Sequence, residues 1–311
     1  MKKNEIFVSL LISLIVITSG LDAQELSFTK EIFTYKQVHG HEIKANIFLP
    51  DSIPNCPVLI YFHGGGFIFG NRDVGLKDVL RDSLLAHQIA VVSADYRLAP
   101  ETKLDEILLD VRDCVLWIKK HGPQEFQIDT SRIAVAGGSA GGYLAMTTGF
   151  TVTPPPNTII AISTANEFTG TTPVIGDRSI LEKPGPYDIV SDAPISYGDY
   201  DARITLWRFL AVNHLSLYEV FGFDVSKDPE RLKHFRLTEH IKSSYPPTLL
   251  MHAKQDHLIP VEQVERLYKF MQEKRIKTEF YLTETGHSTQ LLQQNPDAST
   301  AIVDFLERTF K

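Results

Sequence analysis

Cysteine is scarce in this chain, with two residues among 311, Cys56 and Cys114. Neither has a second cysteine or a cluster of ligand side chains within a few positions, which argues against a cysteine metal site and against a thiol nucleophile. Cys56 comes directly before an apolar run of strand character, and Cys114 lies inside a stretch of helical spacing. We therefore predict two buried free thiols rather than a disulfide.

Basic clusters are also absent, because no block of five or more lysines and arginines occurs and the formal net charge is -7. The chain has no electrostatic footprint for nucleic acid or for an anionic membrane surface. It lacks a G-x-G-x-x-G motif and a complete P-loop, the usual glycine-rich signatures of phosphate binding. With 43% hydrophobic and 22% charged residues, the composition is that of an ordinary globular protein.

The longest apolar run is too short to span a membrane. Lys2 and Lys3 precede an almost uninterrupted apolar stretch at residues 6–18, which is shorter than the ~20 residues that a spanning helix needs. This arrangement is typical of a signal peptide. We predict that residues 1–23 are a signal peptide and that residues 24–311 form the mature domain. The expected location is periplasmic or secreted, with no stable membrane anchor after cleavage.

Short apolar runs alternate along the chain with longer stretches of helical spacing. An antiparallel hairpin is predicted first, from residues 29–38 and 42–48 with Gly40 in the turn. Buried strands are then expected at residues 58–62, 90–93, 133–136, 158–162, 248–251 and 278–282. Helices are expected at residues 74–87, 104–120, 143–148, 261–273 and 298–310. This order predicts the α/β class, with a mostly parallel central sheet and helices on both faces.

The interval at residues 166–245 breaks this alternation, because it has no clean strand and is dense in aromatic residues. We interpret it as an inserted lid segment. Its aromatic side chains, among them Phe168, Trp207 and Phe221, form either the core of the insertion or the wall of a substrate pocket. The sequence leaves both alternatives open.

A G-x-S-x-G motif indicates the reaction chemistry. It runs from Gly137 to Gly141, follows an expected strand, opens an expected helix and has Ser139 at its centre. A sharp strand-to-helix turn exposes the serine side chain, while the flanking glycines tolerate the cramped backbone. Glycine-rich turns also bind phosphate, but the missing P-loop elements favour a nucleophilic serine.

A second glycine-rich stretch, at residues 63–67, follows the first of the buried strands. Three consecutive glycines let the main chain approach a substrate oxygen without obstruction, although a flexible turn is the alternative. We predict an oxyanion hole formed by the backbone N–H groups of Gly65, Gly66 and Ala140. His63 and Gly64 are predicted to support this loop, with His63 as a hydrogen-bonded scaffold rather than a base.

A serine hydroxyl needs an adjacent base to accept its proton and a carboxylate to hold that base. His287 follows the last expected strand, where a loop can reach over the sheet, and is the predicted base. Asp256 follows the preceding strand and is the predicted acid, with Glu284 as a weaker substitute. His252 and His257 lie near the same acid and are less favoured as the base. The chain order of serine, aspartate and histidine suits this arrangement.

Four motifs together resemble the α/β-hydrolases, and the chain is most similar to the hormone-sensitive-lipase-like carboxylesterases. They are residues 63–67, the segment Asp95-Tyr96-Arg97-Leu98-Ala99-Pro100-Glu101, the serine motif, and the pair of Asp256 and His287. The resemblance implies an α/β-hydrolase fold and a serine esterase mechanism. It also implies that residues 95–101 are structural and fix a turn near the active-site loops.

Two departures from the family pattern bear on the substrate. Gly138 stands where these esterases usually have aspartate, and in this respect the chain is similar to secreted acetylxylan and feruloyl esterases. The mature region before His63 is short, so any lid must come mainly from residues 166–245.

We therefore predict a serine carboxylesterase that hydrolyses short-acyl esters through an acyl-enzyme, without a metal or organic cofactor. The expected partner is a small-molecule or carbohydrate ester, and deacetylation of carbohydrate is a subtype of this activity. The alternatives are a serine peptidase of the prolyl-oligopeptidase type and a non-catalytic binding protein on a hydrolase scaffold. No pattern in the sequence indicates an oligomeric state.

Overall fold

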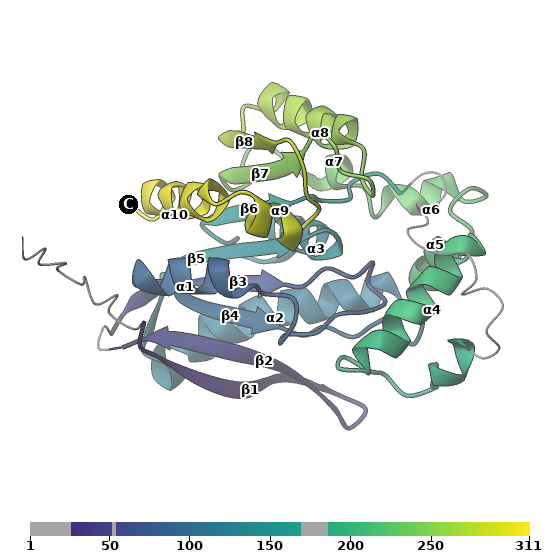
Figure 1. Ribbon diagram of the computed structural model, residues 1–311, viewed down its shortest axis with the longest axis horizontal. Helices are drawn as coiled ribbons and strands as arrows, with labels where there is room; N and C mark the ends of the chain where they lie inside the picture. The colour runs from purple at the N-terminus through teal and green to yellow at the C-terminus, as the bar shows by residue number, and fades with distance from the viewer. Residues whose placement is uncertain (1–25, 52–53, 169–185) are drawn as a thin grey trace, which may run out of the picture.

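The fold is built on one twisted sheet. A computed structural model describes residues 26–51, 54–168 and 186–311, in which eight strands pair in the order β1-β2-β4-β3-β5-β6-β7-β8 (Figure 1). The predicted signal peptide, residues 1–23, lies outside the described residues. Within the described ranges, no helix combines the length and the apolar character needed to cross a membrane.

An antiparallel hairpin opens the sheet, as the sequence predicts. β1 (Phe28–Val38) pairs with β2 (His41–Pro50) through a turn at His39 and Gly40, which both have positive φ. β2 also pairs antiparallel with β4 (Ala90–Ala94), and this pairing attaches the hairpin to the rest of the sheet.

The remaining strands run parallel, and most of them are buried. They are β3 (Cys56–Phe62), β4, β5 (Ile128–Gly138), β6 (Thr158–Ile162), β7 (Thr248–Ala253) and β8 (Thr278–Thr283). Alternate residues of a strand face two separate cores: Ile60 and Phe62 of β3 pack on one face, and Leu59 and Tyr61 pack on the other. A strand covered on both faces has a continuous apolar sequence, which is why these strands are predictable.

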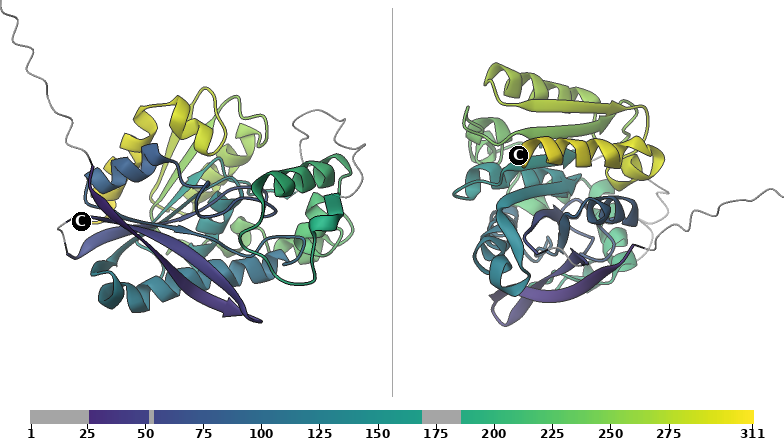
Figure 2. Two further views of the ribbon diagram at one scale, coloured as in Figure 1. Left: turned by 60° about the horizontal axis from the view of Figure 1, so that its bottom comes forward. Right: turned by 90° about the vertical axis from the view of Figure 1, so that its left-hand side faces the viewer.

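Helices cover both faces of the sheet (Figure 1, Figure 2). One face carries α2 (Leu104–Glu125), α3 (Ala140–Thr151) and α8 (Val261–Glu273), and the other carries α1 (Asp78–Ala86), α9 (Thr289–Gln294) and α10 (Asp297–Thr309). This arrangement confirms the predicted α/β class and the α/β-hydrolase fold. Cys56 and Cys114 are both buried free thiols, as predicted.

The segment between β6 and β7 has no strand in its described part and folds into short helices. They are η2 (Pro186–Ile189), α4 (Tyr200–Val212), α5 (Ser216–Phe221), α6 (Pro229–Lys233) and α7 (Leu237–His240). α4 and α5 lie beyond the carboxyl ends of the parallel strands, the edge at which α/β proteins place functional groups (Figure 1).

Candidate active site

Ser139 occupies the sharp turn between β5 and α3. Its dihedral angles are φ 55° and ψ −120°, and its amide donates a hydrogen bond to the carbonyl of Ile162 at 2.8 Å. A strained backbone of this kind costs roughly 1–3 kcal/mol and persists only where its surroundings enforce it. A Cβ on Gly137 would lie 2.2 Å from the carbonyl oxygen of Gly141, and a Cβ on Gly141 would lie 2.0 Å from that of Phe62. The turn therefore requires both outer glycines of the motif.

The space beside Gly138 is filled by Ser288. A Cβ at position 138 would lie 2.0 Å from the side-chain oxygen of Ser288 and 3.1 Å from that of Tyr61. Ser288 has φ 54° and ψ −119°, and its amide donates to the side chain of Ser163 at 2.9 Å. Glycine at this position thus has a local cause, because the residue that follows His287 takes the room that a side chain would need.

His287, on the loop after β8, pairs with Asp256, on the loop after β7. Nδ1 of His287 and Oδ2 of Asp256 are 2.7 Å apart, and the carboxylate is fully buried. Its other oxygen accepts hydrogen bonds from the amides of Leu258 and Ile259 at 2.8 and 3.0 Å. Burial opposes ionisation, but the hydrogen bond with His287 and the two amides hold the pKa of Asp256 below its ordinary value. A proton on Nδ1 leaves Nε2 of the imidazole as the basic nitrogen.

The other candidate acid and bases occupy different environments. Nε2 of the buried His252 lies 3.0 Å from the carbonyl of Ile259 and 3.7 Å from Oδ2 of Asp256. Burial lowers the pKa of His252, so its neutral ring supports the loop that carries the acid. Glu284 forms an ion pair with a lysine at the surface, and His257 is exposed at the rim of the cavity described below.

The glycine-rich loop after β3 lies against the turn that carries Ser139. A Cβ on Gly64 would lie 2.9 Å from the carbonyl oxygen of Gly138 and 3.3 Å from the Cβ of Ser139. Gly65 and Gly66 follow with φ of 114° and 58°, values that favour glycine. The predicted oxyanion loop and the predicted nucleophile are therefore direct neighbours.

His63 is buried at the base of this loop. Its ring stacks on Tyr96 with centroids 4.2 Å apart, and its Nδ1 lies 2.7 Å from the carbonyl oxygen of Gly64. Burial lowers the pKa of His63 to about 4, so the ring is neutral at pH 7 and donates this hydrogen bond. A ring held in this way suits the expected scaffold role.

These loops open into one cavity of about 670 Å³, a volume suited to a small ligand. The predicted site residues that line it are His63, Gly64, Gly65, Gly66, Ser139, Ala140 and His287. Asp256 is not part of the lining and lies behind His287. Across the described residues, no group of three or more histidine, cysteine, aspartate or glutamate side chains is placed to hold a metal ion.

The cavity has two chemically different walls. The oxyanion loop and α4 contribute the aromatic side chains Phe69, Tyr200 and Trp207. The loops after β7 and β8, together with α9, contribute the polar side chains Gln255, His257, Thr285, Thr289, Gln290 and Gln294. The aromatic residues of the insertion thus serve both predicted purposes, since others, such as Phe221 and Phe235, are buried in the core.

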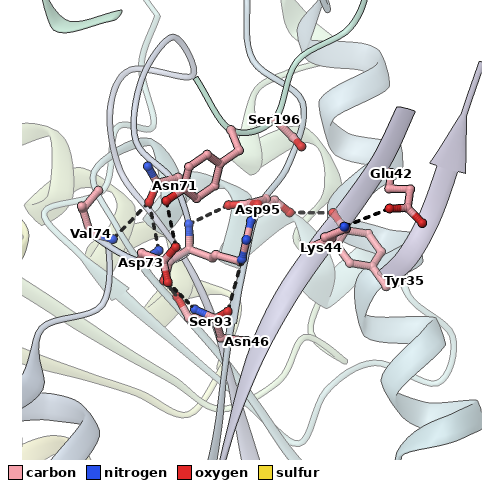
Figure 3. A network of polar contacts seen from close by, with 12 residues as sticks. Tyr35, Glu42, Lys44, Asn46, Asn71, Asp73, Val74, Ser93, Asp95 and Ser196 are labelled. Carbon is pink, nitrogen blue, oxygen red and sulfur yellow. Dashed lines mark hydrogen bonds and ion pairs between the residues drawn. The ribbon is translucent and has the colours of Figure 1, made fainter. Parts of the chain in front are cut away.

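Residues 95–101 stabilise the loops around the cavity. Asp95 accepts a hydrogen bond from the amide of Arg72 at 2.6 Å and forms an ion pair with the guanidinium of the same residue (Figure 3). Nε of Arg72 donates to Asn46 on β2 at 3.2 Å, and the hydroxyl of Tyr35 on β1 donates to the carbonyl of Asp95 at 2.6 Å. The chain just beyond the oxyanion loop is thereby joined to the opening hairpin.

Arg203 on α4 ties the inserted segment to the same region. It pairs with Glu101 at 2.7 Å, with side-chain exposures of 3% and 0%, and donates to the carbonyl of Ile68 at 2.8 Å. One turn later on the helix, Trp207 packs against Phe69 with ring centroids 5.4 Å apart. Sequence reasoning misses Arg203, because its partners are distant in the chain and no local pattern marks a buried arginine.

Fold and site together define the class of protein. A mostly parallel sheet carries a serine on a strained strand-to-helix turn, followed in the chain by an aspartate and a histidine that pair with each other. The protein is an α/β-hydrolase. It belongs to the BD-FAE family, which matches residues 45–271, and the resemblance to serine esterases of this fold is thereby confirmed.

The chain is also similar to individual curated proteins and solved structures. The chain is 31% identical over 219 residues to the esterase LipC of Mycobacterium tuberculosis, covering 68% of this chain and 48% of LipC. It is 27% identical over 311 residues to the non-reducing polyketide synthase Preu6 of Preussia isomera, covering 87% of this chain and 14% of that protein. The chain thus spans less than half the length of these curated relatives. A solved esterase of Pyrobaculum calidifontis, 22% identical with a TM-score of 0.66, covers 91% of this chain and 87% of its own and shares the fold.

Proposed function

We propose that the protein is a serine carboxylic ester hydrolase, with Ser139 as nucleophile, His287 as general base and Asp256 as the acid that orients the base. One observation carries the proposal. The strained turn that bears Ser139 opens into the same cavity as His287, whose Nδ1 is held 2.7 Å from Asp256. Membership of the BD-FAE family and the similarity to an esterase support it.

Each proposed step uses a group on the cavity wall. The hydroxyl of Ser139 attacks the ester carbonyl while Nε2 of His287 takes its proton, and the oxyanion is stabilised by the amides of Gly65, Gly66 and Ala140. His287 then gives the proton to the leaving alcohol, and the acyl group stays on Ser139. A water molecule attacks this acyl-enzyme by the same route and releases the carboxylic acid.

The polar wall favours an ester of a hydroxylated alcohol. The departing oxygen must face His287, so the alcohol occupies the side of the cavity where β7 and β8 end. Hydroxyl and amide side chains gather there, including Thr289, Gln290 and Gln294. We therefore extend the proposal to short-acyl esters of carbohydrate, such as acetylated sugars.

Hydrolysis of p-nitrophenyl esters of increasing acyl length tests the proposal. We expect the highest kcat/KM at acetate or butyrate, and a fall in kcat of at least about a thousandfold for Ser139→Ala. Ser131→Ala, which removes an exposed hydroxyl from the same strand, is the matched control and should keep the wild-type rate. Undiminished hydrolysis by Ser139→Ala would contradict the assignment of Ser139 as the nucleophile. Peptide hydrolysis without ester hydrolysis would favour the peptidase alternative, and binding without turnover would favour a non-catalytic scaffold.

Two finer proposals have tests of their own. Acetate release from acetylated xylan should be faster than from an acetate ester of a simple alcohol, and the opposite order would contradict a carbohydrate substrate. We also propose export directed by residues 1–23. The protein recovered from the periplasm or medium should then begin near residue 24, whereas an intact leader on cytosolic protein would contradict export.

A further inference from the structure

Trp207 lies where the inserted segment meets the oxyanion loop. A Cβ on Gly66 would lie 2.7 Å from Nε1 of Trp207, so the indole nitrogen sits over this glycine. Trp207 is partly buried and lines the cavity. Its indole N–H, which can only donate, makes no hydrogen bond within the described parts of the chain. The donor is therefore available to a molecule in the cavity.

The indole is held in place before any substrate binds. Arg203, one turn earlier on α4, is fixed by its buried ion pair with Glu101. Phe69 packs against the indole, and Tyr200 packs against Phe69 with ring centroids 5.8 Å apart. A donor fixed in this way loses little conformational freedom when it binds a ligand.

The order of the strands in the sheet indicates which part of an ester lies next to the indole of Trp207. β5, which carries Ser139, lies between β3 on one side and β6, β7 and β8 on the other. His287 approaches from the β8 side and serves the leaving alcohol, so the acyl group is directed toward the loop after β3 and toward α4 (Figure 1). The indole therefore borders the acyl group.

The proposed oxyanion hole already supplies backbone donors for the ester carbonyl oxygen. The N–H and Cα–Cβ bonds of Gly66 point in different directions, and Nε1 of Trp207 lies 2.7 Å from the ideal position of the Cβ. This leaves the indole N–H for the atoms that follow the carbonyl carbon in the acyl group.

We infer that Trp207 is a specificity-determining residue whose indole N–H binds an oxygen atom in the acyl group, one or two carbons from the ester carbonyl. Among short-acyl esters, those with an alkoxyacyl, hydroxyacyl or ketoacyl group should therefore be preferred over aliphatic esters of the same chain length. A purely aliphatic acyl group leaves the indole N–H without an acceptor once water is displaced, which weakens binding. This inference rests on the proposed ester hydrolase function.

Two esters that differ in one atom test the inference. 4-Nitrophenyl methoxyacetate has an oxygen where 4-nitrophenyl butyrate has a methylene. Trp207→Phe keeps an aromatic ring but removes the N–H, and should lower the ratio of kcat/KM for methoxyacetate to that for butyrate about five- to tenfold. The different intrinsic reactivities of the two esters cancel, because the same pair is compared in both proteins.

Trp117→Phe is the matched control. Trp117 lies on α2, stacks on Phe33 with centroids 4.5 Å apart and is not part of the cavity lining, so this variant should keep the wild-type ratio. An unchanged ratio in Trp207→Phe, or equal losses with both esters, would overturn the inference. In either case the ester hydrolase proposal would stand, since it fails on other results: no hydrolysis of either ester by the wild-type protein, or undiminished hydrolysis by Ser139→Ala.

Tryptophan emission gives a second readout that does not depend on turnover. The double variant Trp117→Phe/Ser139→Ala keeps Trp207 as its sole tryptophan, because the chain has two. We expect ethyl methoxyacetate to shift the emission of Trp207 to longer wavelength, and ethyl butyrate to shift it less. Equal shifts with the two esters would contradict a hydrogen bond to the acyl oxygen.

Discussion

Three serine residues with positive φ lie close together in the site, and one of them is the proposed nucleophile. Ser139, Ser163 and Ser288 have φ of 55°, 48° and 54°. The amide of Ser288 is bonded to the side chain of Ser163, and the amide of Ser139 is bonded to the carbonyl of Ile162, the residue before Ser163. Because each loop is held by its neighbour, strain is retained at one point of the molecule, as is common at functional sites.

Replacing Ser139 by glycine should relieve this strain. Alanine keeps a Cβ in the left-handed conformation, whereas glycine has none, so Ser139→Gly should unfold with a free energy about 1 kcal/mol higher than that of Ser139→Ala. Urea unfolding measures the difference. Ser131 has no positive φ, so at that position the alanine variant should be the more stable. The same order at both positions would mean that the turn is not strained.

His63 should make the protein less stable in mild acid. Its pKa is about 4 in the folded protein and about 6.5 in an unfolded chain. Between these values the unfolded state binds a proton that the folded state does not, so the free energy of unfolding falls as pH falls, by up to about 1.4 kcal/mol per pH unit. Urea unfolding across this range should show that the free energy of unfolding depends less steeply on pH in His63→Gln than in the wild-type protein. The exposed His87 offers a control. If His87→Gln reduced the pH dependence of the free energy of unfolding to a similar extent, the effect would not arise from His63.

At the scale of helices and strands, long apolar runs and regular spacing are the reliable signals. β6 and α8 have the bounds that the sequence predicts, at residues 158–162 and 261–273. The helix expected from residue 74 begins instead at Asp78, because the side chain of Asn71 accepts hydrogen bonds from the amides of residues 73 and 74. α9 is too short to show a period and owes its position to burial of its leucines in the core, which sequence alone does not reveal.

The position of α4 should depend on the ion pair between Arg203 and Glu101. Arg203→Met leaves a buried carboxylate without a partner, and we expect the free energy of unfolding to fall by about 3–5 kcal/mol. The double variant Arg203→Met/Glu101→Leu should recover much of this loss, because no unpaired charge remains. Arg266 pairs with Glu167 at the surface, with exposures of 58% and 34%, so Arg266→Met should cost less than about 1 kcal/mol. A double variant as unstable as Arg203→Met would disprove this account.

At the scale of the whole molecule, the cavity is assembled from segments far apart in the chain. Ser139, Asp256 and His287 each lie just after a predictable strand, so their meeting at one edge of the sheet is predictable too. The aromatic wall is not predictable in the same way. Trp207 lies beside Gly66 on a helix that the buried ion pair of Arg203 and Glu101 attaches to this region, and no local sequence pattern indicates that pair.

A covalent inhibitor should therefore protect two separate parts of the chain at once. A phosphonofluoridate is expected to label Ser139 and to place its substituents against the oxyanion loop and α4. Hydrogen exchange followed by mass spectrometry should then slow at residues 63–70 and 200–212, while β1 in the distant hairpin should exchange as before. Protection confined to the oxyanion loop would mean that α4 does not contact the bound group.

The two thiols have a consequence for where this chain can be produced. Cys56 and Cys114 are 3% and 0% exposed, and burial raises the pKa of both, so neither readily forms a reactive thiolate. With no cross-link between them, the covalent chain is the same in a reducing and in an oxidising compartment. A chain released on either side of a membrane would reach its native state without an oxidant or a disulfide isomerase, and material made in a reducing cytosol would serve for every measurement of activity, binding and stability proposed above.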